Sequence, residues 1–118
     1  MQLALNTRTI DGVLVVDCNG RIVFGEESAL LRDAVRKLIT TNNHIVLNLA
    51  GVNYIDSGGL GTLVSLYTTA RNAGGAIKLS SLTQRVGDLL QVTKLVTVFE
   101  VHPNEQQAVA SFLKTAAA

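Results

Sequence analysis

A short polar segment between two apolar stretches holds the residues best suited to chemistry. The segment from Asp56 to Gly61 reads Asp-Ser-Gly-Gly-Leu-Gly and lies where an apolar strand is expected to give way to a helix. Small residues there leave the backbone N–H groups of the helix N-terminus uncovered, which favours an anion by about 0.3–1 kcal/mol at exposed sites. That anion is either external or attached to the chain. Alternatively, Asp56 or Ser57 is only an N-cap, which contributes about 1 kcal/mol, and the glycines only allow tight packing.

The same segment does not fit the templates of catalytic or nucleotide-binding sites. Its glycines match neither the G-x-G-x-x-G pattern nor a Walker A loop, and a nucleophile elbow would need glycine in place of Ile55. His44 and His102 fall at the edges of predicted strands, where we expect them to be solvated, and the chain has too few His and Cys residues for a metal site. We therefore expect no catalytic residue, no metal and no cofactor, and a small enzyme remains only as an alternative from another functional class.

The spacing of apolar residues predicts the elements that position this segment. The predicted order is ββαβαβαβα, with strands at 3–10, 13–18, 44–49, 76–79 and 95–99. Helices are predicted at 26–40, 57–72 and 83–90, followed by a last helix after Asn104 whose apolar stripe contains Ala108, Val109, Phe112 and Leu113.

Two features of this order place neighbouring strands. Gly12 after Asp11 is a turn signal, so the first two strands are predicted to form a hairpin with the second strand central. The second strand and the strand at 44–49 are then expected to be neighbours whose carboxyl ends meet at one edge. Arg21, Phe24 and Glu26 should therefore lie beside the Ser57 loop and share one docking face with it.

Composition limits the classes to which the protein can belong. The 118 residues predict a single domain over 1–118, and with 47% hydrophobic and 16% charged residues the chain is expected to be globular. A net charge of +1 argues against direct binding of nucleic acid. The chain has no apolar run of about 18 residues and no export signal at its start, so neither membrane insertion nor secretion is expected. The single cysteine, Cys18, is expected to be a buried thiol in a protein of the reducing cytoplasm.

The sequence resembles the STAS domain family, and specifically its anti-sigma factor antagonists. The resemblance is carried by residues 45–49 and 54–61, supported by Gly20, by Gly74-Gly75 and by the stretch from Arg85 to Leu95, and it extends over nearly the whole chain. It implies an α/β fold: a single STAS-like domain with a small mixed sheet of four to five strands and helices packed mainly on one side. In that family the serine after the motif aspartate is the phosphorylation site, and by similarity that serine is Ser57.

This resemblance implies a binding protein rather than an enzyme. An antagonist of this family binds a cytoplasmic serine kinase that is also an anti-sigma factor, and so releases a sigma factor to RNA polymerase. Phosphorylation breaks the complex and a phosphatase resets it. The residues expected to bind the partner are Arg21, Phe24, Glu26, Asp56, Ser57, Gly58, Gly59 and Leu60.

Two positions depart from the family pattern. Many antagonists have Ser or Thr where this chain has Gly58, so Ser57 is the only hydroxyl there, and Arg21 to Phe24 replace a segment that is acidic in the family. Phe24 either anchors the partner or packs under the first helix. Gly59 is expected at the rim of the docking surface, so its replacement by valine should impair binding more than stability.

Related uses of the same fold remain open alternatives. A STAS domain can be a subunit of a stress-sensing assembly, or an accessory subunit of a lipid-transporting ABC complex. The genes beside the coding sequence discriminate these uses from partner switching, since a serine kinase gene favours switching and a permease with an ATPase favours transport.

Overall fold

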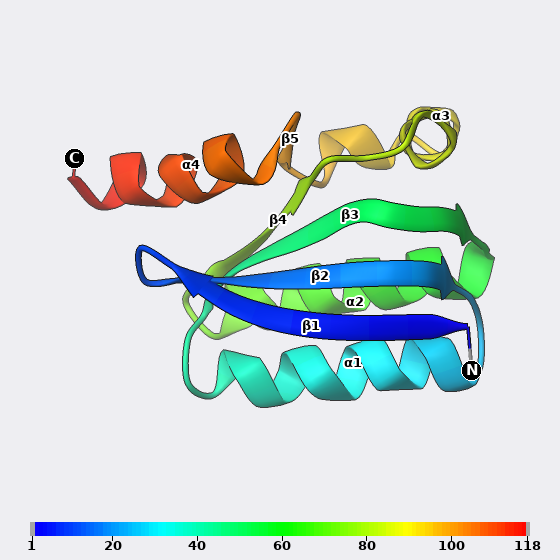
Figure 1. The fold of residues 1–118 in the computed structure, drawn as a ribbon, viewed down its shortest axis with the longest axis horizontal. Coiled ribbons are helices and arrows are strands. Elements are labelled where there is room, and N and C mark those ends of the chain that lie inside the picture. The colour runs from blue at the N-terminus through cyan, green and yellow to red at the C-terminus, as the bar shows by residue number, and fades with distance from the viewer. Residues whose placement is uncertain (1, 118) are drawn as a thin grey trace.

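The structure, a computed structural model, describes residues 2–117 and the side chains of residues 2–113, and it confirms the predicted order ββαβαβαβα (Figure 1). The strands are β1 (Leu3–Ile10), β2 (Val13–Ile22), β3 (His44–Ile55), β4 (Ala76–Ser80) and β5 (Val101–His102). The helices are α1 (Glu26–Ile39), α2 (Ser57–Asn72), α3 (Gln84–Val92) and α4 (Glu105–Ala117), with a single 3₁₀ turn, η1 (Leu95–Thr97), before β5.

The five strands form one mixed sheet in the order β1-β2-β3-β4-β5. The hairpin of β1 and β2 is antiparallel, as predicted, and Asp11 and Gly12 both adopt the positive φ that a tight hairpin turn requires. β2 and β3 are parallel neighbours that pair from Leu14 with Ile45 to Ile22 with Ile55. Their carboxyl ends therefore meet at the same edge of the sheet, where α1 and α2 begin.

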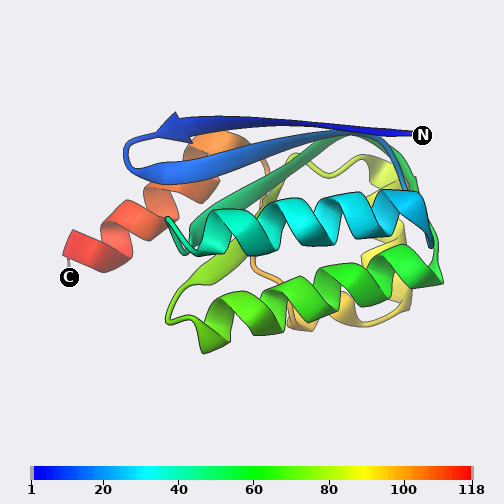
Figure 2. The ribbon, with the colours of Figure 1, turned by 90° about the horizontal axis from the view of Figure 1, so that it is seen from below.

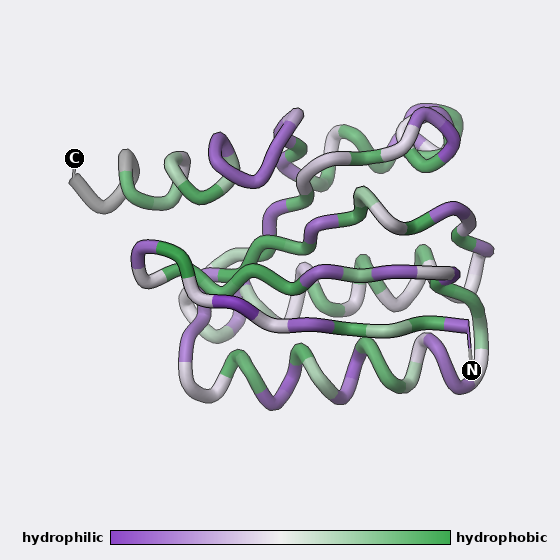
Figure 3. The backbone as a smooth tube through the Cα atoms, in the orientation of Figure 1, coloured by the Kyte–Doolittle hydropathy of each residue, from purple (hydrophilic) through white to green (hydrophobic). Residues whose placement is uncertain are grey.

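Helices cover the two faces of the sheet unequally (Figure 2). α1 and α2 lie against one face, and residues of α3 join the same main core, whereas α4 packs on the opposite face. Figure 3 shows hydrophobic residues on the side of α1 that faces the sheet and hydrophilic residues on its other side. Packing mainly on one side of the sheet is thus confirmed.

α4 is held on its face by a small apolar cluster and by an ionic one. The apolar cluster consists of Val13, Val15, Val46, Ala108, Val109 and Phe112, and it is separate from the main core. Arg8 of β1 binds Asp17 of β2 at 2.7 Å and Glu105 of α4 at 2.8 Å, and Asn48 donates to Glu105 at 2.9 Å. These contacts bridge the first turn of α4 to the sheet.

The last predicted strand is wrong. Residues 95–99 form η1 and its exit rather than a strand, because Leu95, Val98 and Phe99 recur at helical spacing and pack on the main core. Lys94 precedes the turn in a left-handed conformation, with φ of 66°, and β5 follows only at Val101–His102. A short apolar run can be read as strand or helix from its pattern alone.

Other boundaries and side chains also differ from expectation. β2 and β3 extend to Ile22 and Ile55, well beyond the predicted ends, so they reach the candidate segment directly. Leu113, predicted to face inward, is 41% exposed.

The two histidines, predicted to be solvated, have partners in the structure. His44 stacks on Phe112 with ring centroids 4.8 Å apart, and His102 Nε2 lies 2.6 Å from Glu100, so neither is fully solvated.

Candidate functional site

The candidate site lies at the carboxyl ends of β2 and β3. Ile22 and Ile55 are paired in the sheet, and just beyond them the Asp56 backbone N–H donates to the Ile22 carbonyl at 3.3 Å. The chain then turns into α1 on one side and α2 on the other. The residues that follow β2, 23–25, form the β2 exit. Their predicted adjacency to the Ser57 loop is therefore confirmed.

Asp56 joins the two loops. Its carboxylate accepts a hydrogen bond from the Gly59 backbone N–H at 2.8 Å, which makes it the N-cap of α2. Both carboxylate oxygens also lie 3.1 Å from the Phe24 backbone nitrogen, which donates across from the β2 exit. These N–H donors, the Gly59 N–H foremost, hold the pKa of the Asp56 carboxyl below its ordinary value.

Replacing Asp56 by alanine is expected to lower the free energy of unfolding by about 1–2 kcal/mol at neutral pH, because α2 loses its cap. Asparagine, itself a good cap, should cost less. The folded-state pKa of Asp56 is depressed, so its contribution is present above the ordinary pKa and disappears as the pH falls through the lowered one. Urea unfolding of both variants and the parent at pH 7 and in acid measures this. Equal midpoints of the parent and the alanine variant at pH 7 would show that the carboxylate is not the cap.

Ser57 is the first residue of α2 and is exposed. Because Asp56 takes the capping role, the Ser57 hydroxyl is left without a hydrogen-bond partner among the described residues. The open choice between Asp56 and Ser57 as the cap is thus decided in favour of Asp56. The Ser57 hydroxyl stands free at the positive end of a helix of 16 residues.

Gly58 and Gly59 let the β2 exit approach α2 closely. A Cβ atom on Gly59 would lie 2.0 Å from the Ile22 carbonyl oxygen, and one on Gly58 would lie 2.6 Å from the Phe24 Cβ. Neither glycine has a positive φ, so close packing rather than backbone conformation requires them. Gly59 is buried and Leu60 is 9% exposed within the main core. These two residues position the segment and offer a partner almost no surface.

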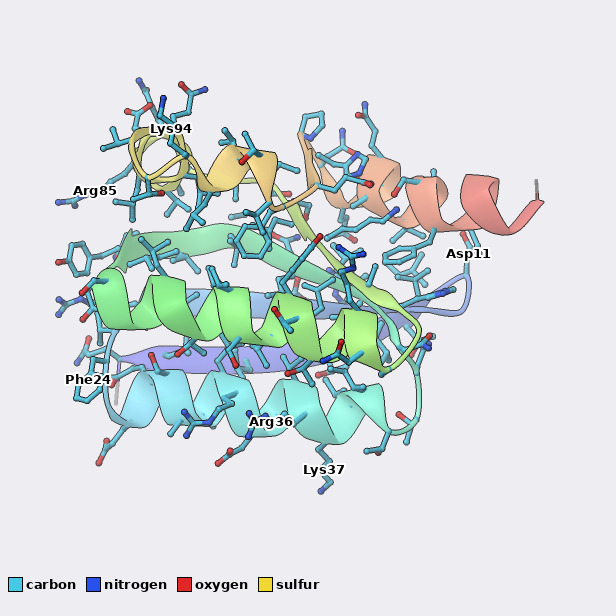
Figure 4. All side chains as sticks on the ribbon, turned by 180° about the vertical axis from the view of Figure 1, so that it is seen from behind. Asp11, Phe24, Arg36, Lys37, Arg85 and Lys94 are labelled. Atoms are coloured by element: carbon cyan, nitrogen blue, oxygen red, sulfur yellow. The ribbon has the colours of Figure 1, made fainter. Side chains whose placement is uncertain are left out.

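Arg21, Phe24 and Glu26 are all exposed around the same loop. The Phe24 side chain is 82% exposed, so the alternative that it packs under the first helix is wrong. A hollow of about 540 Å³ opens beside it between α1 and α2, lined by Phe24, Gly25, Ser28, Arg32, Gly58, Gly61, Thr62 and Ser65. Figure 4 shows Phe24 at one end of the molecule, far from Asp11 in the hairpin turn.

Sequence reasoning missed Tyr54 and Arg85 as parts of this end of the molecule. The guanidinium carbon of Arg21 lies 5.0 Å from the centroid of the Tyr54 ring, and that of Arg85 lies 5.5 Å from it. Arg85 and Phe24 occupy the same end (Figure 4). No local pattern reveals this cluster, because its members come from β2, β3 and α3.

Other side chains show little reactive chemistry. Cys18 is buried, and desolvation raises the pKa of its thiol to about 12, so it stays protonated. Within the part of the chain whose side chains are described, no three His, Cys, Asp or Glu residues gather as a metal site would require. Among the described residues, no helix has both the length and the apolar character needed to cross a membrane.

Comparisons with known proteins find relatives that match most of the chain. The STAS domain model matches residues 4–108. The anti-sigma F factor antagonist of Paenibacillus polymyxa is 27% identical over 110 residues, covering 92% of this chain and 93% of the relative. The anti-sigma-B factor antagonist of Bacillus subtilis is 28% identical over 80 residues, covering 68% of this chain and 73% of the relative. The Bacillus cell fate determinant SpoIIAA in its phosphorylated form has a similar fold, with a TM-score of 0.69 at 14% identity, covering 92% of this chain and 99% of that one.

Proposed function

Because the chain belongs to the STAS domain family, we propose that it acts as an anti-sigma factor antagonist controlled by phosphorylation of Ser57. Its partner is a cytoplasmic anti-sigma factor that is also a serine kinase. Binding of the unphosphorylated chain releases a sigma factor, phosphorylation of Ser57 ends the complex, and a phosphatase restores it. The cytoplasm is the compartment in which these partners meet.

The observation that carries this proposal is the free hydroxyl of Ser57. A kinase needs a side chain that is exposed and not engaged in the fold, and Ser57 is both, because the carboxylate of Asp56 already caps α2. Phosphate attached there would lie at the N-terminus of α2, where the helix dipole and the free N–H groups stabilise negative charge. The modified domain can therefore stay folded.

The same phosphate changes the surface that the partner meets. It adds about −1.5 to −2 charges beside the exposed Phe24 ring. A partner surface that covers an apolar ring loses contact when that charge must be desolvated. A coupling of about 1–3 kcal/mol would change the partner affinity about 5- to 150-fold, which is enough to redirect a shared kinase.

Recovery of the chain from its host, followed by mass spectrometry of its peptides, tests the proposal. We expect phosphate on Ser57 in a fraction of the molecules. Ser65, which lines the hollow beside Phe24, serves as an internal comparison on the same helix. Phosphate on Ser65 with none on Ser57, or phosphate on neither under any growth condition, would refute the proposed regulation.

Replacing Phe24 by alanine should weaken binding of the kinase by about 1–3 kcal/mol, since exposed aromatic side chains are frequent anchors of interfaces. The free energy of unfolding should barely change, because the ring is 82% exposed in the free protein. Leu113→Ala is the matched control, an exposed apolar residue on α4. Affinity measured by calorimetry and unfolding midpoints measured in urea decide the matter. A change in neither quantity would remove Phe24 from the interface.

A further inference from the structure

Tyr54 is held between two arginines that come from different elements. Arg21 pairs with Tyr54 across the β2–β3 ladder, and Arg85 reaches the same ring from the first turn of α3. Both guanidinium groups lie within 6 Å of the ring centroid, at 5.0 Å and 5.5 Å, which is the range of cation–π attraction. Attraction of this kind favours guanidinium positions beside the ring.

Among the described side chains, neither arginine is paired with a carboxylate at salt-bridge distance. Both are exposed, and within residues 2–113 neither guanidinium makes an ion pair or a side-chain hydrogen bond. Two carboxylates are nearby. The Glu27 carboxylate accepts a hydrogen bond from the Gln2 backbone N–H at 2.9 Å, which lowers the pKa of Glu27 with a smaller contribution from Arg21, and Asp88 lies three residues after Arg85 on α3. The donors of both guanidinium groups thus remain available to an outside anion.

An apolar hollow adjoins the two charges. Its volume is about 260 Å³, and its lining is formed by Tyr54, Ile55, Arg85, Val86, Asp88, Leu89 and Val92. Val92, at the end of α3, is 79% exposed and borders this hollow. Unpaired positive charge and exposed apolar surface therefore meet at one place.

We propose that Arg21, Tyr54, Arg85 and Val92 form a docking surface for an acidic segment of a protein partner, one that carries a carboxylate next to an aliphatic side chain. The carboxylate binds the guanidinium groups, which match it in geometry and lie beside the Tyr54 ring. The aliphatic side chain enters the hollow beside Val92. Complementary charge selects the segment and the apolar contact adds to its affinity.

This inference deepens the proposed function, on which it rests for the identity of the partner. Tyr54 lies two residues before Asp56, so an acidic segment on this surface would extend the contact made around Ser57. Figure 4 shows Arg85 at the same end of the molecule as Phe24, pointing away from its body. The chemistry of the surface does not require Ser57 to be phosphorylated, so the two ideas can be tested separately.

The test is a titration of the ¹⁵N-labelled chain with a synthetic ten-residue peptide of alternating glutamate and leucine, followed by NMR. We expect the largest shift changes at Tyr54, Arg85 and Val92, and weaker binding as salt is added. Arg85→Glu should weaken binding at least tenfold. Arg71→Glu is the matched control, because Arg71 also lies over a tyrosine, 5.8 Å from the centroid of Tyr67, yet at the other end of α2. Circular dichroism verifies that both variants are folded.

Each result of this titration either supports or overturns the docking surface. Equal affinity of the parent and Arg85→Glu, shift changes centred elsewhere, or equal binding of a lysine–leucine peptide would each overturn the inference. The same shift changes with inorganic phosphate alone would show a simple anion site in place of a protein-docking surface. If the peptide fails to bind while Ser57 carries phosphate in the host, the surface is wrong and the proposed function stands. If the peptide binds and Ser57 is never modified, the docking surface stands and the proposed regulation is wrong.

Discussion

Gly59→Ala is expected to lower the free energy of unfolding by about 3 kcal/mol or more, the upper end of what overpacking costs. The added methyl group would lie 2.0 Å from the Ile22 carbonyl oxygen. That oxygen belongs to the end of a paired strand and also accepts the Asp56 N–H, so it cannot move aside without breaking the β2–β3 register. Since domains of this size are stable by about 5–15 kcal/mol, such a loss removes a large share of the total.

Two neighbouring glycines are compared with Gly59 in this experiment. Gly58→Ala would place its methyl group 2.6 Å from the Phe24 Cβ, which rotation of the ring does not move, so it should also cost stability, whereas Gly61→Ala meets nothing within 4 Å and is the control. Gly61→Ala should stabilise the protein by up to about 1 kcal/mol through helix propensity. Urea unfolding of the three variants gives the ranking. If Gly59→Ala unfolds at the same midpoint as the parent, the close approach of β2 and α2 is not as described.

Ser57→Ala is expected to abolish phosphorylation by the cognate kinase and to leave the fold intact. Asp56 keeps the cap of α2, so the change in stability should stay within about 0.5 kcal/mol, the range of ordinary surface substitutions. Incubation of both proteins with the kinase and radioactive ATP gives the readout. Undiminished label on the variant would place the acceptor elsewhere.

The phosphorylated chain should in turn bind the kinase about 5- to 150-fold more weakly than the unmodified one. Ser57→Asp should reproduce only part of this loss, because a carboxylate carries one charge and fewer acceptor oxygens than phosphate. The circular dichroism spectrum should stay unchanged, which separates loss of binding from unfolding. Equal affinity of the phosphorylated and unmodified chains would rule out the switch.

Local patterns were sufficient for the features that depend on neighbouring residues. The Asp11-Gly12 turn, the amphipathic spacing of α1 and the meeting of a strand with a helix at Ser57 were all predicted from short segments. The side-by-side placement of the β2 exit and the Ser57 loop followed from general rules of strand connection. Whether any of these residues binds a partner stays a prediction.

What the sequence could not reveal depends on contacts between distant segments. The expectation that a side chain on Gly59 would impair mainly binding is replaced by one of lost stability, because the Ile22 carbonyl lies against it from another strand. The exposure of the Phe24 side chain depends on the path of the chain after β2, where the Phe24 backbone N–H donates to the Asp56 carboxylate of another segment. The pairing of Arg85 with Tyr54 joins residues that are 31 positions apart, and no spacing pattern links them.

The apolar cluster under α4 lies on the opposite face of the sheet from the main core (Figure 2). α4 depends on a few apolar side chains and on Arg8 between Asp17 and Glu105, so it can open while the main core stays folded. Arg8 holds the pKa of both carboxyls below their ordinary values, so this support is present above those values and is lost as the pH falls through the lowered ones. We therefore expect acid to weaken the attachment of α4, and its opening would uncover Val13, Val15 and Val46, a β-branched strand surface that favours self-association.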